Sequence, residues 1–240
     1  MKNTAQKSYS GRKSYSGFTL IEVAIVLVII ALMAAGVVGG KAMMRSATLN
    51  TIIKEANTYK SAVNSFQEKY RYWPGDHPSA TSYWPSAAGN GDGDGIILEQ
   101  THLFERYYVW QHLALAGFVK GTFTGLISSP RDEVGVNMMG SDTIDNGGYR
   151  IGVQNKWGRR DNTIQLSSQV GHYLNGSTLS PIDAQSIDDK MDDGRIQTGS
   201  VRSEVGAEVG ASDCFVGTTP NEEYNIGNSN ISCKIYFYFK

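Results

Sequence analysis

One carboxylate lies inside a long apolar segment near the start of the chain. Residues 18–40 carry a single ionisable side chain, Glu22, four residues after Phe18. A helix over this segment would be about 34 Å long, enough to cross a hydrocarbon core of roughly 30 Å. Because a charge inside a membrane is costly, such a residue is expected to have a partner and a function. We therefore expect Glu22 to pair with a cationic group.

A glycine-rich acidic loop is the second place where chemistry is possible. Asn90, Asp92 and Asp94 occupy relative positions one, three and five of an EF-hand-like calcium loop. The twelfth position, where a bidentate glutamate closes an EF-hand, is Thr101. The spacing therefore does not predict an EF-hand, and it predicts a calcium site only if another ligand arrives from elsewhere. The alternative is a turn in which glycine and aspartate provide left-handed backbone and solubility.

A second acidic cluster covers residues 188–194 and contains Asp192 and Asp193. Acidic residues beside a helix end are commonly just solvated. The two other interpretations are a calcium site and a contact with a basic neighbour such as Arg159 and Arg160.

The four histidines lack a catalytic setting in the sequence. None is paired with an acid or a cysteine at a motif spacing, and the chain has no serine nucleophile elbow and no glycine-rich loop followed by Lys-Ser or Lys-Thr. The net charge is −1, and the basic turn at residues 156–160 is too short to indicate DNA binding. We therefore expect a protein that is not an enzyme, and no nucleic-acid partner is evident.

The first element that positions these groups is a basic leader. Residues 1–17 contain lysine and arginine but no acid, which keeps the N-terminus cytoplasmic under the positive-inside rule. An ordinary secretory signal has its small-residue cleavage site after the apolar core. Here Gly17 precedes that core. A cut after Gly17 would leave the apolar segment on the mature chain, with Phe18 as its new N-terminus.

Helical periodicity continues beyond the apolar segment. No proline occurs between residues 18 and 72, so one helix could run to about Tyr70 and stop at Trp73-Pro74. The glycines at 36, 39 and 40 are the place where a bend or local melting would be cheapest. Apolar residues spaced by three and four form one stripe: Leu49, Ile52, Ala56, Tyr59, Val63, Phe66 and Tyr70.

The remainder of the sequence predicts a head of short helices and strands. Helices are predicted over residues 98–117 and 179–190, the second with Ser180 as N-cap and proline at its first position. The fold class is α+β: a long N-terminal helix, membrane-spanning in its first half, packs on a head with an antiparallel sheet. The clearest predicted strands are residues 149–153, 163–168 and 233–239.

The two cysteines, Cys214 and Cys233, lie close to the C-terminus. In an exported head, such a pair predicts a disulfide rather than two free thiols. Closing a loop of about 20 residues would stabilise the fold by roughly 3 kcal/mol in the chain-entropy treatment.

The sequence around Gly17 resembles the type IV prepilin-like signal, in which glycine is followed by Phe-Thr-Leu-Ile-Glu-Val, here residues 18–23. The resemblance implies that a prepilin peptidase cuts between Gly17 and Phe18 and N-methylates Phe18. It also implies that Glu22 pairs with the N-terminal ammonium of a neighbouring subunit during assembly. The alternative is an ordinary single-pass anchor whose glutamate reaches the membrane interface.

The resemblance further implies a division into four segments. These are a removed leader (1–17), a transmembrane and filament-core helix (18–40), its amphipathic continuation (41–72) and a periplasmic or extracellular head (73–240). The precursor would reside in the bacterial inner membrane, with the N-terminus cytoplasmic and the head periplasmic, before it joins a pilus or pseudopilus. Its partners would be prepilin peptidase, other pilin or pseudopilin subunits, an inner-membrane assembly platform and the lipid bilayer.

These expectations favour a structural subunit, a pilin or minor pilin, of a type IV pilus-like filament. A pseudopilin of a type II secretion system is the alternative, and calcium in the head is known among those proteins. A membrane-anchored periplasmic binding or enzymatic domain that never polymerises is the alternative from another class.

Overall fold

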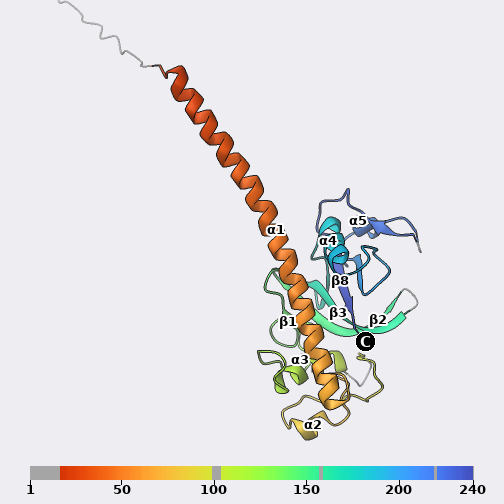
Figure 1. Ribbon diagram of the computed structural model, residues 1–240. Helices are drawn as coiled ribbons and strands as arrows, with labels where there is room; N and C mark the ends of the chain where they lie inside the picture. The colour runs from red at the N-terminus through yellow and green to blue at the C-terminus, as the bar shows by residue number, and fades with distance from the viewer. Residues whose placement is uncertain (1–16, 99–103, 157–158, 219–220, 240) are drawn as a thin grey trace, which may run out of the picture. The chain divides into compact units, whose positions relative to one another are not determined.

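The computed structural model describes residues 17–98, 104–156, 159–218 and 221–239. The chain divides after Ser46 into two compact units, which are described separately. The second unit, Ala47–Lys240, contains the sheet and is called the head. Figure 1 labels the five helices and the strands β1, β2, β3 and β8.

Helix α1 (Leu20–Tyr70) is continuous, which confirms the predicted long helix. It remains helical through the glycines at 36, 39 and 40. It ends where Arg71, with a φ of 68°, turns into the left-handed region just before Trp73-Pro74. The predicted stop is therefore correct, because a left-handed residue ends the repeating helical geometry and proline cannot restart it there.

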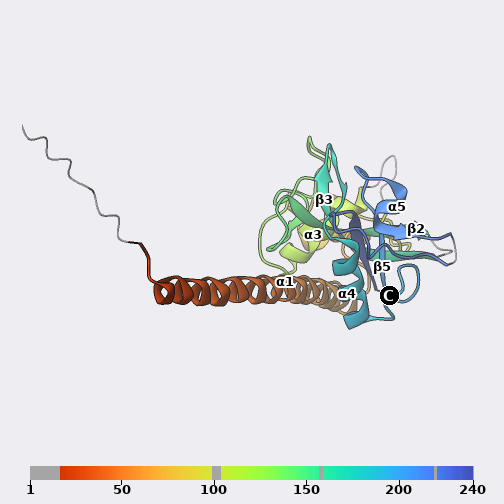
Figure 2. The same cartoon turned by 90° about the horizontal axis from the view of Figure 1, so that it is seen from above.

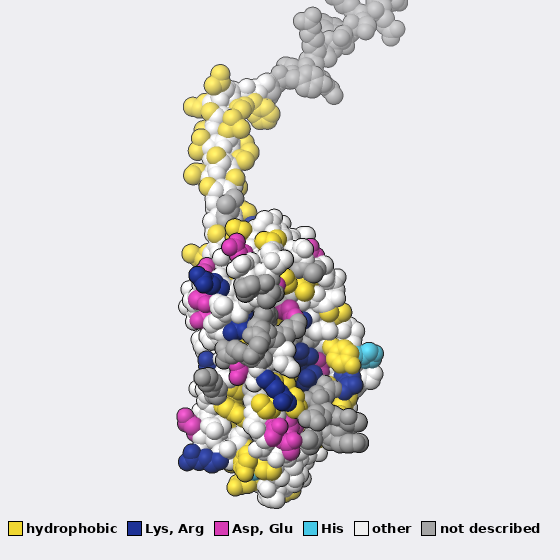
Figure 3. All heavy atoms as spheres, turned by 90° about the vertical axis from the view of Figure 1, so that its right-hand side faces the viewer, with side chains coloured by type: hydrophobic (Ala, Val, Ile, Leu, Met, Phe, Trp, Pro, Cys, Tyr) yellow, Lys and Arg dark blue, Asp and Glu magenta, His cyan; other side chains and the backbone are white. Residues whose placement is uncertain are grey.

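The first unit holds the apolar part of α1, and its large hydrophobic side chains are exposed. Figure 3 shows hydrophobic side chains covering the visible face of this segment. Part of the helix is long and apolar enough to cross a membrane, judged by length and composition.

Within the head, α1 buries the stripe that the sequence predicts. Ile52, Val63 and Phe66 are fully buried. Tyr59 makes edge-to-face contacts with Trp110, at 5.1 Å between ring centroids, and with Tyr149, at 4.8 Å. Large aromatic side chains arranged in this way contribute both buried area and specific geometry, so they fix how the helix lies on its neighbours.

The sheet of the head is antiparallel, in the order β1-β2-β3-β8-β5, and β4 also pairs with β3 (Figure 1). One face is apolar, and its central row is Ile151, Ile164, Phe237 and Val201 in cross-strand register. The strands are β1 (Met139–Gly140), β2 (Gly147–Lys156), β3 (Arg159–Val170), β4 (Tyr173–Gly176), β5 (Val201–Val205) and β8 (Cys233–Tyr238).

Short helices and a small ribbon complete the head. Figures 1 and 2 show α5 and the blue segments next to it apart from the green α3. The helices are α2 (Ala80–Tyr83), α3 (Glu105–Leu115), α4 (Pro181–Met191) and α5 (Ala211–Cys214), and the ribbon pairs β6 (Phe215–Val216) with β7 (Glu223–Tyr224).

Helix α4 confirms its predicted position and cap, because the Ser180 side chain accepts the backbone N–H of Asp183. The prediction of a helix over 98–117 is wrong at its start, since α3 begins at Glu105. The segment before it is tied to the sheet: Val153 N–H donates to the Ile97 carbonyl, and Ile97 N–H donates to Asn162. Residues 99–103 lie outside the described part of the chain.

The central hairpin is longer than predicted. Strands β2 and β3 pair from Gly147 with Ser168 to Lys156 with Arg159, whereas the sequence suggested only residues 149–153 and 163–168. The added pairs are polar, and backbone hydrogen bonds in a ladder do not require apolar side chains. The alternation of hydrophobicity therefore underestimates the length of these strands.

Candidate processing and assembly site

The peptide bond that the sequence predicts to be cut lies just before α1. Gly17, Phe18 and Thr19 precede the helix and are exposed. Apart from its chain neighbours, no described residue comes within 4 Å of a Cβ atom built on Gly17, and Phe18 is 88% exposed. An exposed, non-helical segment is the kind of backbone that a peptidase can bind and cut.

Glu22 lies in the first turn of α1, next to Thr19. Its Oε2 accepts both the backbone N–H and the hydroxyl of Thr19, each at 2.7 Å. The Glu22 backbone N–H in turn donates to Thr19 Oγ1 at 3.3 Å. The carboxylate that the sequence singled out is thus one helical turn from Phe18 and has local hydrogen-bond donors.

The helix that carries Glu22 exposes an extensive apolar surface. Such a surface is stable only against lipid or against other apolar helices. Its exposed large side chains are Leu20, Ile21, Val23, Ile25, Val26, Leu27, Val28, Ile29, Ile30, Leu32, Met33 and Val37.

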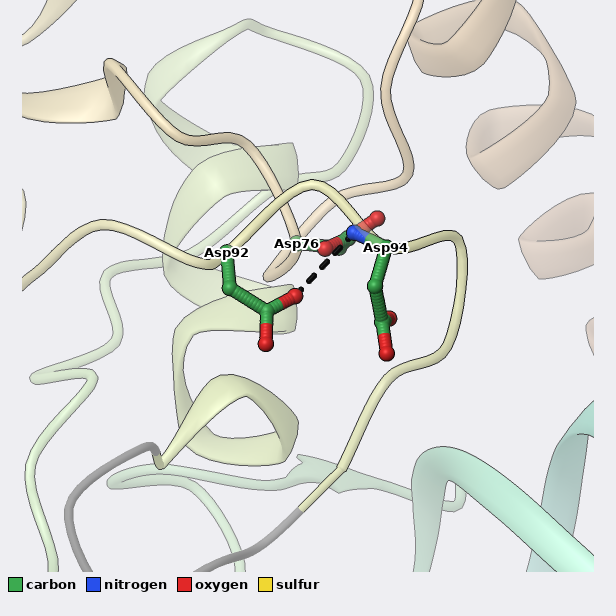
Figure 4. Close-up of side chains that lie close together, drawn as sticks. All are labelled: Asp76, Asp92 and Asp94. Atoms are coloured by element: carbon green, nitrogen blue, oxygen red, sulfur yellow. Dashed lines mark hydrogen bonds between the residues drawn. The ribbon is translucent and has the colours of Figure 1, made fainter.

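In the head, the acidic glycine loop brings Asp92 and Asp94 next to Asp76 (Figure 4). One carboxylate oxygen from each residue lies within 4.8 Å of the others. Asp76 is buried, whereas Asp92 and Asp94 are exposed. Sequence reasoning missed Asp76, because it follows the long helix and is separated from the loop along the chain. The Asn90 Oδ1 atom accepts the backbone N–H and the hydroxyl of Thr81.

Two buried carboxylates hold this loop by its backbone. Asp76 accepts the N–H groups of Gly93, at 2.7 Å, and Gly95, at 3.0 Å. Glu105 accepts those of Asp92, at 3.0 Å, and Leu98, at 2.9 Å. Burial raises the pKa of Asp76 to about 6 and that of Glu105 to about 7, although these hydrogen bonds act in the opposite direction. Negative charge in this loop is therefore only partly compensated.

The carboxylates of Asp76, Asp92 and Asp94 meet some of the requirements of a calcium site. Calcium prefers oxygen ligands at about 2.3–2.6 Å, so two ligands of one ion lie at most about 5 Å apart. The spacing meets this limit, but calcium takes about six to eight ligands, and both oxygens of Asp76 already accept backbone N–H groups. Calcium binding here would need further oxygen ligands, and it stays a prediction.

The second acidic cluster joins Asp188 to Asp192 and Asp193. Asp188 is buried and accepts the Tyr224 hydroxyl at 2.9 Å, and burial raises the pKa of Asp188 to about 7. Asp192 accepts the backbone N–H groups of Ser200 and Val201. These carboxylates therefore close the connection between α4 and β5, and calcium at Asp192 and Asp193 remains a prediction as well.

Cys214 and Cys233 form a disulfide, as the sequence predicts. Both are fully buried, and their Cα atoms are 5.0 Å apart. The bond links the end of α5 to the first residue of β8, so it closes the C-terminal loop onto the sheet.

Within the head, Glu55 of α1 is a buried carboxylate that contacts strand β2 and the loop before it, and sequence reasoning missed this contact. It accepts the Tyr149 hydroxyl at 2.6 Å, the Asp142 backbone N–H at 2.9 Å and the Ser141 hydroxyl at 3.2 Å. The apolar stripe of α1 did not predict that Glu55 is buried, because Glu55 is a charged residue next to the apolar Ala56. Only the opposing loop and strand reveal its function.

The chain combines an exposed glycine, an apolar helix with an acid in its first turn and an α+β head, and this combination fits a membrane-anchored subunit. Residues 12–38 match the family model described as the prokaryotic N-terminal methylation motif. This motif is the signature of the prepilin-type signal, and it supports a type IV pilin-like or pseudopilin-type subunit. The motif implies processing by prepilin peptidase and assembly with other pilin subunits. No curated protein and no solved structure matches the chain.

Proposed function

We propose that this chain is a structural subunit, a pilin or minor pilin, of a type IV pilus-like filament. The precursor resides in the bacterial inner membrane with its N-terminus cytoplasmic and its head periplasmic. Prepilin peptidase cuts between Gly17 and Phe18 and methylates Phe18. The subunit then leaves the bilayer through an inner-membrane assembly platform. The observation that carries the proposal is Glu22 on an uncovered apolar helix inside the methylation motif.

The position of Glu22 supports a function in assembly. Cleavage would create an ammonium group at Phe18, one helical turn before Glu22. An unpaired carboxylate in an apolar filament core costs several kcal/mol, whereas one paired with the ammonium of a neighbouring subunit does not bear this cost in full. Pairing between subunits is possible at only one axial stagger, so this single charge can set the register of the filament.

The head favours a pilin or minor pilin. The segment after Tyr70, which is 170 residues long, is larger than a minimal major pseudopilin needs. A pseudopilin of a type II secretion system is the second candidate, and the acidic clusters around Asp76 and Asp188 favour it, since calcium in the head is known in that class. Imaging surface filaments and assaying secretion in a deletion strain separates the two candidates.

We also infer that the head is not an enzyme. Two histidines are buried in the described part of the head, and both have structural contacts: His112 Nδ1 accepts the Gly75 N–H, and His77 Nδ1 accepts the Ser79 N–H, both at 3.0 Å. Burial lowers the pKa of His112 to about 4, so this side chain is neutral at physiological pH. These contacts support a packing function for both side chains.

Replacing the glycine before the cleavage site tests the proposal. We expect Gly17→Ala to accumulate as an uncleaved precursor in cells that express prepilin peptidase. Gly11→Ala is a closely matched control, because residues 7–11 and 13–17 have the same sequence, Lys-Ser-Tyr-Ser-Gly. Intact mass would show removal of residues 1–17 and one added methyl group in the control. Equal processing of both variants, or none in the native chain, would contradict the proposal and favour a non-polymerising anchor.

A further inference from the structure

A cleft in the C-terminal part of the head lies between the β6–β7 ribbon and the connection from α4 to β5. Its volume is about 510 Å³, and a smaller cavity of about 310 Å³ shares three of its lining residues, Arg195, Glu222 and Glu223. Concave sites of roughly 300–1,000 Å³ are typical of ligand binding in proteins. The two cavities together are called the acidic cleft.

Several contacts hold the two walls of the acidic cleft together. The disulfide between Cys214 and Cys233 encloses the ribbon. The Tyr224 hydroxyl of β7 donates to Asp188 of α4 at 2.9 Å, and the Asn225 N–H donates to the Cys214 carbonyl at 2.9 Å. The cleft is therefore formed in the folded head before any partner binds.

The lining of the cleft combines negative charge with apolar surface. Glu223 is exposed, and among the described residues no hydrogen bond or ion pair reaches its side chain. Arg195 also lines the cleft, but its backbone N–H donates to Asp193, so an acid lies beside this cation. Val216 and Ile226 are apolar lining residues that are 44% and 62% exposed. Such a lining suits a lysine or arginine, whose aliphatic part packs on apolar surface while its charged end pairs with a carboxylate.

The end of the β2–β3 hairpin is basic and extends beyond the next strand of the sheet. Strand β8 pairs with β3 only as far as Thr163, whereas β2 and β3 stay paired as far as Lys156 and Arg159. The sequence from 155 to 160 contains three cations and no acid. Arg160 is exposed, and in the described part of the chain no ion pair reaches its side chain. Residues 155, 156, 159 and 160 are called the basic hairpin end.

We propose that the basic hairpin end of one subunit docks in the acidic cleft of a second copy of this chain. Arg160 pairs with Glu223, and its aliphatic part lies against the apolar lining. The two surfaces belong to different elements of the head, so the contact is heterologous, and repeating it builds a ring or an open helical filament rather than an isolated two-fold dimer. This inference rests on the proposed function, because it adds a contact between heads to the same filament.

Charge reversal tests the pairing. Each full-length chain is expressed in its native host, and assembly is measured by quantitative cross-linking between subunits. Arg160→Glu and Glu223→Arg should each lower assembly about fivefold, the upper end for one exposed ion pair. The combined variant should return to within about twofold of the native level, because the pair forms again with its charges exchanged. Lys120→Glu and Asp145→Arg are matched controls, since they reverse exposed charges elsewhere in the head and should assemble normally.

Cysteine substitution tests the geometry. Asn155 pairs with Arg160 across the hairpin, Asn221 lines the smaller cavity, and both asparagines are exposed. A chain with both Asn155→Cys and Asn221→Cys should give a ladder of disulfide-linked dimers, trimers and longer species on a non-reducing gel, because every subunit offers both surfaces. Either single variant should give no such species.

Three results would overturn the proposal. A double cysteine variant without a ladder would exclude the contact, and dimers from a single cysteine variant would show a two-fold contact instead. Failure of the combined charge reversal to restore assembly would indicate that each surface binds something other than its counterpart. Equal losses in the control variants would also overturn the proposal, because assembly would then respond to surface charge in general. Absence of cleavage or assembly in the native chain would instead reject the proposed function itself.

Discussion

Within the head, Glu55 connects helix α1 to strand β2 and to the loop before it by hydrogen bonds. Replacing Glu55 should therefore measurably destabilise the head. The carboxylate accepts three hydrogen bonds, from the Tyr149 hydroxyl, the Asp142 N–H and the Ser141 hydroxyl. Glu55→Ala would leave the fully buried Tyr149 hydroxyl without this acceptor. Water can reach the exposed Asp142 but not Tyr149, so the tyrosine bears most of the cost.

The expected magnitude follows from these contacts. A hydrogen bond to a charged group contributes about 1.5–3 kcal/mol, and a buried donor left without a partner costs about 1–3 kcal/mol. Because the three bonds share one carboxylate and are not additive, we expect Glu55→Ala to lower the free energy of unfolding by about 3 kcal/mol. In a unit of this size that corresponds to a fall in Tm of roughly 6–12 °C. Glu55→Gln retains one acceptor oxygen and should lose about half as much.

Thermal unfolding of the full chain in detergent, followed by near-ultraviolet circular dichroism, measures this effect. Glu68→Ala is the matched control, an exposed glutamate on the same helix. A double-mutant cycle with Tyr149→Phe should show that the two losses are not additive, since the phenylalanine leaves no hydroxyl to satisfy. Glu55→Ala unfolding within 2 °C of Glu68→Ala, with additive losses in the cycle, would refute the reasoning.

Four further predictions concern the head and the helix. Replacing both Cys214 and Cys233 by serine should cost about 3 kcal/mol, because the disulfide closes a separation of 19 residues; an unchanged Tm would contradict this. The raised pKa values of Asp76, about 6, and Glu105, about 7, mean that the folded state binds these protons more tightly than the unfolded state. Their stabilisation is thus complete below the unfolded pKa and is lost as pH rises through 6 and 7, so Tm should increase from pH 8 to pH 5, and a decrease would show that other groups dominate. If calcium binds the acidic loop, it should raise Tm at pH 8, and Asp76→Asn should abolish the increase, whereas no response to calcium or chelator would make the calcium prediction wrong. Glu22→Gln should be cleaved normally but assemble poorly, and normal assembly would exclude its function in register.

The sequence by itself determined the N-terminal part of this protein, through the end of α1 at Tyr70. The leader, Gly17, Phe18 and Glu22 form one contiguous signal, and the apolar segment and the stripe behind it predict α1 to its last turn. The Ser180 cap of α4 is equally local. These features depend on neighbours within one or two helical turns, which is why a linear pattern contains them.

Only the tertiary structure decided which distant groups meet. Asp76 lies next to Asp92 and Asp94 of the acidic loop. Glu105, the first residue of α3, accepts backbone N–H groups of Asp92 and Leu98 and so connects the loop to that helix. Glu55 acquires its function from a strand and a loop almost a hundred residues away, as the hydrogen bond to Tyr149 shows. Helix α3 starts at Glu105, whereas Ile97, next to the predicted start, is hydrogen-bonded to Val153 and Asn162 of the sheet. In each case, contacts between residues far apart in the sequence determine the arrangement. The spacing of residues along the chain does not predict such contacts.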